Sequence, residues 1–186
     1  MKQMNVVDVL GRNYVEGLYE SEKSKEVETG FRIISEINKK LFEKIPYKVI
    51  FTEKDVYGSA KEMRERVTET GLIYIYTGWS GHPFLSQHDN NIGRAVHDVF
   101  AHMVCGCPFT FTGELNAYFE QRKYYPKNVW GILFAEIPMQ TAAYYYTKGH
   151  DFPQRAIKAT EQEMALVEHL KRDYSKNSVL QALKIS

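Results

Sequence analysis

The chain has 186 residues, 44% of them hydrophobic and 13% aromatic, and its 24 basic and 23 acidic side chains leave a net charge of +1. This composition is typical of one folded domain with a sizeable core and excludes a disordered chain. The balanced charge, without a long basic run, gives no signal for nucleic acid or anionic lipid as a partner.

The start of the chain and its cysteines predict the compartment. No stretch approaches the roughly twenty apolar residues of a membrane span, and the opening MKQMNVVDVLGRNY lacks the zones of a signal peptide. Cys105 and Cys107 are separated by one residue, a spacing that rarely allows a disulfide, so we interpret them as free thiols packed as small buried side chains. We therefore expect a cytoplasmic protein.

The first part of the chain predicts an arm and then a small sheet. Residues 1–20 are poorly patterned and indicate an N-terminal arm that orders only against a partner, followed by a single domain over 21–186. Apolar residues recur at helical spacing over 20–44 and predict an amphipathic helix. The β-branched and aromatic runs 47–53 and 71–78 predict strands, with a short helix between them.

The rest of the chain is predicted to be helical after a turn-rich loop over 78–91. Helices are expected at about 92–105, 112–122, 128–147, 153–173 and 176–184. The predicted fold class is α+β, with a small N-terminal β-sheet and a predominantly helical C-terminal layer.

The helix predicted at 92–105 carries two histidines in the string VHDVFAH. His97 and His102 are five residues apart, which separates them by about 140° around an ideal α-helix. They therefore lack the i, i+4 spacing of the zinc peptidases. They can share one ion only if the ion sits over the helix end or if a local bulge widens the turn.

The string H-D-V-F-A-H is similar to the H-E-L-L-G-H string of the aromatic amino-acid hydroxylases. In that family two histidines and a later glutamate hold a non-haem iron. The resemblance implies that His97 and His102 are two ligands of a facial triad. It also implies that the third ligand is a carboxylate a few tens of residues further on, from a neighbouring helix.

Glu136 is the predicted third ligand, because it is the only carboxylate in the apolar segment VWGILFAEIPMQTAAYYY. Burying it without compensation costs several kcal/mol, so it needs a partner. A metal ion is one solution, and Arg94 or a raised pKa are the alternatives. Gln140 lies one turn further on and is predicted to support Glu136 from the second shell, while Pro138 predicts a kink between them.

Two other acids and one histidine complete the candidate site. Glu114 lies in the first turn of a predicted helix, which explains an acid there, but it also fits a general base, a second-shell group or an alternative ligand. Asp98, four residues before His102, is a second candidate base. His82, in the loop before the first histidine, is predicted to close over the site as a second-shell residue.

The order HPFLS, RAVHDVFAH, GELNAYFEQ and AEIPMQTAAYYYTKGHDFPQRAI resembles a family of uncharacterised proteins of tailed bacteriophages. Its members read H-P-[FY]-x-S, R-x-V-H-D-x-F-G-H, G-E-x-x-A, T-E-x-x-G-Q and F-x-x-Q-[KR]-A. The resemblance implies a phage origin, a location in the host cytoplasm or in the phage particle, and a shared polar cluster. That cluster falls on His82, His97, Asp98, His102, Glu114, Glu136 and Gln140. The chain departs from the pattern at Ala101 and in AEIPMQ.

Two functions stay open at this point. The first is an enzyme with a mononuclear 2-His-1-carboxylate centre, either an Fe(II) oxygenase or a Zn(II) hydrolase with Asp98 or Glu114 as base, acting on an unidentified small molecule or protein. The second is a virion-associated structural or interaction protein, a homo-oligomer or part of a larger assembly, with a buried polar network or a structural metal. A His-Asp phosphohydrolase is disfavoured, because no histidine lies far enough upstream of VHD.

Overall fold

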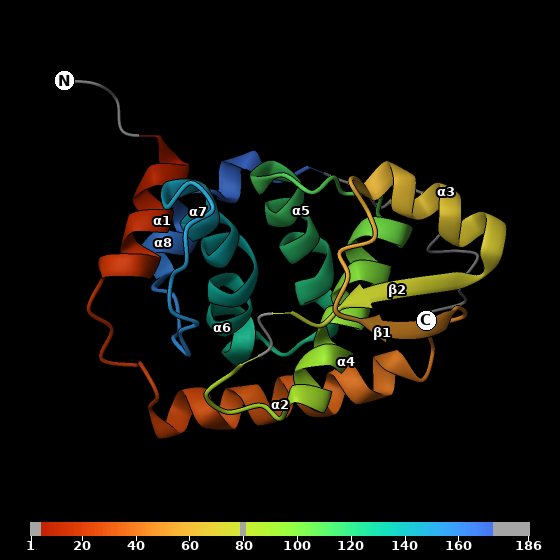
Figure 1. Cartoon of the computed structure of the whole chain (residues 1–186). Helices are drawn as coiled ribbons and strands as arrows, with labels where there is room; N and C mark the ends of the chain where they lie inside the picture. Colours follow the sequence, from red (N-terminus) through yellow and green to blue (C-terminus); the bar gives the residue numbers. More distant parts are fainter. Residues whose placement is uncertain (1–4, 79–80, 173–186) are drawn as a thin grey trace.

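The computed structural model describes residues 5–78 and 81–172. Helices and strands follow one another from the N-terminus as shown in Figure 1. The elements are α1 (Val6–Glu16), α2 (Lys25–Phe42), β1 (Lys48–Thr52), α3 (Ala60–Thr70), β2 (Leu72–Tyr76), α4 (Gln87–His97), η1 (Asp98–Val104), α5 (Phe111–Gln121), η2 (Arg122–Tyr124), η3 (Lys127–Val129), α6 (Trp130–Phe134), η4 (Ala135–Met139), α7 (Gln140–Tyr146), α8 (Glu161–Ala165) and η5 (Glu168–Leu170).

The sheet consists of β1 and β2, which pair in parallel with Lys48 opposite Leu72. Helix α3 makes the crossover between them, beginning at the Ser59 cap and ending at Gly71, whose φ of 69° is the left-handed conformation that favours glycine. Ile73 and Ile75 of β2 are fully buried. The α+β class, with a small N-terminal sheet and a mostly helical remainder, is confirmed.

Helix α1 lies beside α7 at one end of the molecule (Figure 1). Leu10 and Tyr14 of α1 are fully buried. Gly11 permits the close approach of the two helices, because a Cβ at this position would lie 2.4 Å from the carbonyl oxygen of Ala142. Part of the segment that the sequence suggests is an arm therefore belongs to the core.

Helix α2 runs beneath α4 in Figure 1 and packs against it. Of the apolar positions at helical spacing, Phe31, Ile34 and Leu41 are buried and Ile37 is partly buried against the core. Ser24 caps its first turn by accepting a hydrogen bond from the N–H of Val27. This packing fixes α4, which carries His97.

The predicted helix over 153–173 is wrong in its first half. Residues 151–160 contain no regular element, and helix begins only with α8. The guanidinium of Arg155 donates to the carbonyls of Tyr14 and Gly17 and pairs with Glu22, and the residue is buried. These hydrogen bonds and this ion pair to distant residues hold 151–160 in an irregular, non-helical conformation. The helix predicted at 176–184 lies outside the described residues.

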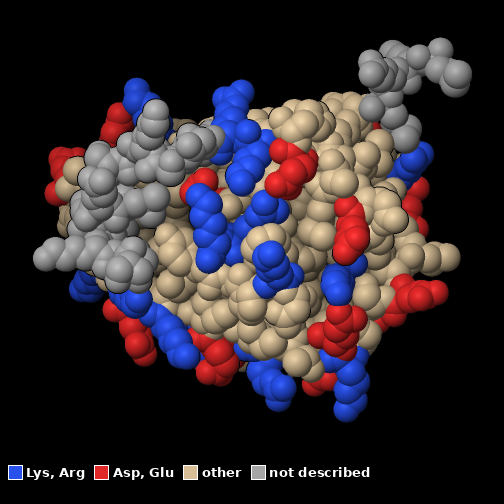
Figure 2. Space-filling view, turned by 180° about the vertical axis from the view of Figure 1, so that it is seen from behind, with Lys and Arg blue, Asp and Glu red and all other residues tan. Residues whose placement is uncertain are grey.

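The surface agrees with the neutral composition. Figure 2 shows acidic and basic side chains interspersed over one face. Among the residues that the structure describes, no helix is both long enough and apolar enough to cross a membrane.

Candidate metal centre

The two histidines lie where helix α4 widens into the π-helix η1. A π-helix pairs residues five apart, as in the bond from the N–H of Cys105 to the carbonyl of Phe100 at 3.3 Å. His97 and His102 are also five apart, so the wide turn brings their rings to one face, with centroids 5.0 Å apart. Of the two arrangements that would let the histidines share an ion, the local bulge is the one present, and it removes the roughly 140° separation of an ideal α-helix.

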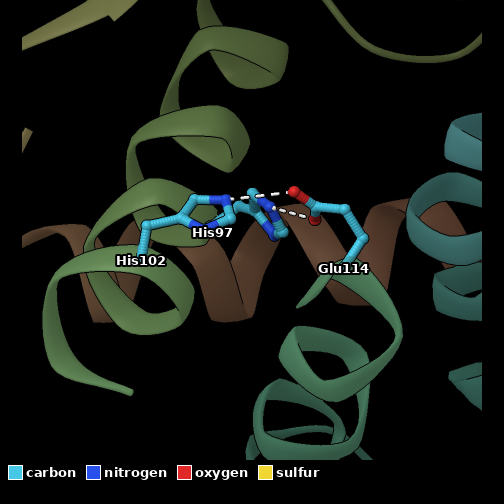
Figure 3. A group of neighbouring side chains, drawn as sticks. All are labelled: His97, His102 and Glu114. Atoms are coloured by element: carbon cyan, nitrogen blue, oxygen red, sulfur yellow. Dashed lines mark ion pairs between the residues drawn. The ribbon is translucent and has the colours of Figure 1, made fainter. Parts of the chain in front are cut away.

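Glu114 of helix α5 reaches both histidines (Figure 3). Its Oε2 lies 3.0 Å from Nε2 of His97, and its Oε1 lies 3.3 Å from Nε2 of His102. Thr110 caps α5 by accepting from the N–H of Gly113, which places Glu114 in the first turn. One ligand atom from each of the three residues lies within 4.8 Å of the others, so they can hold a single ion.

The outer nitrogens of both rings are committed to hydrogen bonds. Nδ1 of His102 lies 2.8 Å from the carbonyl oxygen of Cys107, and since a carbonyl only accepts, this nitrogen carries the proton. Nδ1 of His97 lies 3.0 Å from Oε1 of Gln121, whose amide donates to Tyr125. Each ring therefore directs Nε2 to the common site, which is how metal-binding histidines are usually held.

Without an ion, His97 and Glu114 form a largely buried pair of opposite charges beside His102. Burial opposes the charge on His97, but the Glu114 carboxylate outweighs it and raises the pKa of His97 to about 9. Burial likewise opposes the charge on Glu114, yet the two histidines hold the pKa of this carboxyl well below its usual range. A divalent ion would displace the proton that His97 holds against Glu114.

Asp98, the other candidate base, lines the same cavity as the cluster. Burial raises the pKa of Asp98, and the charges of His102 and His97 act in the opposite direction. It is therefore close to the histidines without being one of the three residues grouped around the common site.

Glu136, the predicted third ligand, lies in a different polar group. Its Oε2 accepts from Nε2 of Gln154 at 3.2 Å, and Oε1 of Gln154 accepts from Nε2 of Gln140 at 2.6 Å. The carboxylate beside the two histidines is Glu114. The candidate ligand set therefore contains Glu114 in place of Glu136. The π-helix η4, which contains Pro138, interrupts the α-helix at Glu136, where the sequence predicts a kink. Sequence reasoning missed Gln154, although the last of the strings compared with the phage family contains it; in FPQRA one residue separates Phe152 from Gln154, where the phage pattern has two.

His82 lies beside Glu136 and is not a member of the group formed by His97, His102 and Glu114. Its Nδ1 accepts from the N–H groups of Phe84 and Leu85, so the ring proton is on Nε2. Burial lowers the pKa of His82 to about 4, and its side chain is 0% exposed. His82 is thus a neutral donor, with Nε2 3.9 Å from Oε2 of Glu136, and Gln140 supports Glu136 only through Gln154.

One cavity of about 880 Å³ adjoins both polar groups. His97, His102 and Glu114 line it, and so do Glu136 and Gln140. A volume of this size accommodates a small organic ligand.

Comparison with known proteins gave no match to a family model, to a curated protein or to a solved structure.

We expect Gln121→Leu to weaken metal binding about 10- to 100-fold, because His97 would lose the acceptor that orients it. The check is a competition titration of zinc against a chromophoric chelator. Gln162→Leu, at an exposed position of α8, is the matched control and should bind as the parent does. Equal affinities for the two variants would contradict the role of Gln121.

Glu136 should make the metal-free protein less stable as pH rises. Burial raises its pKa from 4.5 to about 8, so the folded state binds this proton more tightly than the unfolded state does. The contribution is therefore favourable at low pH and is lost as pH rises from about 4.5 to 8. We expect the unfolding free energy of Glu136→Gln to exceed that of the parent by a few kcal/mol at pH 8 and by much less at pH 5. Urea denaturation in the presence of a chelator measures the difference, and a constant gap across this range would refute it.

Proposed function

We propose that the protein is a metal-dependent enzyme with a mononuclear centre made by His97, His102 and Glu114. The observation that carries the proposal is that all three ligands line one large cavity. Structural zinc sites are closed by four protein ligands, whereas catalytic sites keep positions open for substrate. Within residues 5–78 and 81–172, the group of side chains that could hold a metal ion has only three members, as expected for a catalytic site.

The ligand set suits two ions. Iron(II) held by two histidines and a carboxylate supports oxygen activation, and zinc(II) in such a set supports hydrolysis. The resemblance to the aromatic amino-acid hydroxylases favours iron. Asp98 lines the cavity next to the histidines and is our candidate for the group that accepts a proton from substrate or water.

Metal analysis of protein purified anaerobically, without a His tag, tests the proposal. We expect about one equivalent of ion in the parent and almost none in the His97→Ala, His102→Ala double variant. If the bound ion is iron, the next experiment is an oxygen-consumption assay. If it is zinc, the next experiment is a screen for hydrolase activity. Absence of any metal from a well-folded parent, even after incubation with iron(II) or zinc(II), would overturn the proposal.

The second candidate function is a virion-associated structural or interaction protein of a bacteriophage, present in the host cytoplasm or in the phage particle. It is favoured by the ion pairs of Glu114 with His97 and His102, because they satisfy the buried groups without any metal. The phage origin rests on the string resemblance alone. A parent that is metal-free, folded and assembled into oligomers would support this alternative.

A further inference from the structure

A second polar group borders the cavity, apart from the three candidate metal ligands. It comprises Glu136, Gln140 and Gln154, which come from η4, α7 and the irregular segment over 151–160. The amides form a directed chain, since Gln140 donates to Gln154 and Gln154 donates to Glu136. This chain fixes one oxygen of the carboxyl group and leaves the other for a different partner.

The free hydrogen-bonding capacity of this group points to a ligand. Oε1 of Glu136 is buried and has no hydrogen-bond partner among the described residues. The same is true of Nε2 of His82, whose side chain is 0% exposed and faces Glu136. Buried polar atoms are nearly always paired in folded proteins, and each one left unpaired costs about 1–3 kcal/mol. A ligand that donates to Glu136 would remove part of this cost.

The charged side chains that line the cavity indicate which ligand charge it favours. The carboxyl groups of Asp55, Asp98, Glu114 and Glu136 line it. The guanidinium of Arg94 also lines it, but donates to the carbonyls of Tyr76 and Gly78. No lysine occurs among the described lining residues. His97 also lines the cavity and balances Glu114, and Arg94 offsets one further carboxyl group. Among the described lining residues an excess of acidic groups remains, and it favours a positive ligand over a phosphate or a carboxylate.

Aromatic side chains complete the cavity wall. Tyr144 and Tyr145 line the cavity with 57% and 45% of their surface exposed, and Tyr57 and Phe152 line it as well. Aromatic rings attract cations through their faces and offer apolar contact to the body of a ligand.

Burial raises the pKa of Glu136 to about 8 even with Arg94 nearby, so an additional positive charge would stabilise its ionised form.

We propose that the cavity binds a primary amine with an apolar body, whose ammonium group donates to Glu136. The proposal rests on the proposed function in one respect, because the body of the amine would then extend toward His97, His102 and Glu114. Glu136 is thus a binding residue for the substrate and not a metal ligand. The substrate class is an organic amine of small-molecule size.

Calorimetric titration of the metal-free full chain tests the proposal independently of the metal. The probes are tyramine and 3-(4-hydroxyphenyl)propionate, which share a phenol ring but carry an ammonium and a carboxylate, respectively. We expect tyramine to bind at least about tenfold more tightly than the propionate, as a charge-assisted hydrogen bond predicts. Glu136→Gln should lose about tenfold in tyramine affinity, and Glu65→Gln, an exposed residue of α3 outside the cavity, should lose none.

Each contrary result overturns a stated part of the inference. Equal or tighter binding of the propionate, or no binding of tyramine at millimolar concentration, refutes the amine class. Unchanged tyramine affinity in Glu136→Gln refutes the role of Glu136. The comparison of the two probes on the parent needs no variant and decides the amine class even if Glu136→Gln fails to fold. Since no metal is present, these outcomes leave the metal analysis of the proposed centre unaffected.

Discussion

Glu114→Gln should abolish stoichiometric metal binding, while Glu136→Gln should keep it. The two carboxyl groups both line the cavity, but only Glu114 lies within 3.0–3.3 Å of Nε2 of His97 and His102. An amide oxygen is a neutral and weaker ligand than a carboxylate, so we expect the dissociation constant for zinc or iron to rise by about 100-fold or more.

The measurement is metal content after dialysis against a weak chelator, together with a competition titration. Glu136→Gln is the matched control, because it makes the same chemical change on the same cavity. Loss of metal in Glu136→Gln with retention in Glu114→Gln would reverse the assignment. It would also mean that the side chains rearrange when the ion binds.

Gly113→Ala should destabilise the protein more than an average substitution does, by about 3 kcal/mol or more. A Cβ at this position would lie 1.9 Å from the carbonyl oxygen of Pro108 and 2.8 Å from its carbon, and backbone atoms cannot move aside as a flexible side chain can. The loop is also held by bonds from the N–H of Thr110 to Pro108 and from the N–H of Cys107 to Ala101.

Urea denaturation of the metal-free proteins measures this loss. Gly81→Ala, where a Cβ would meet nothing within 4 Å, is the control and should change the unfolding free energy by less than about 0.5 kcal/mol. Because Gly113 precedes Glu114, any folded fraction of Gly113→Ala should also bind metal less tightly. If Gly113→Ala is as stable as the control, the backbone around Pro108 adjusts to the added methyl group at little cost, and the prediction is wrong.

The elements with strong local signals were predictable from the sequence. Strands β1 and β2 are short β-branched runs between turn formers, and α2 has a regular apolar stripe. The region around Arg155 was not predictable, because its conformation depends on bonds to Tyr14, Gly17 and Glu22, more than a hundred positions earlier. Such distant partners override a local helical pattern.

The candidate site was predictable in its histidines and not in its third ligand. Glu114 and Glu136 are both acids on helices that follow the histidines, and position along the chain does not reveal which helix face turns toward them. The cap at Thr110 and the contact of Gly113 with Pro108 orient Glu114, and both depend on the folded loop. Glu136 instead accepts a hydrogen bond from Gln154 and belongs to the second polar group.

The π-helix η1 has a consequence for how metal sites are found in sequences. A search for zinc- or iron-binding helices that requires histidines four residues apart passes over His97 and His102, because the additional residue belongs to the widened turn. Allowing one inserted residue between the two histidines, together with a glutamate after a capped turn, would retrieve chains of this type. Uncharacterised sequences with histidines five apart should therefore be screened for bound metal alongside those with the shorter interval.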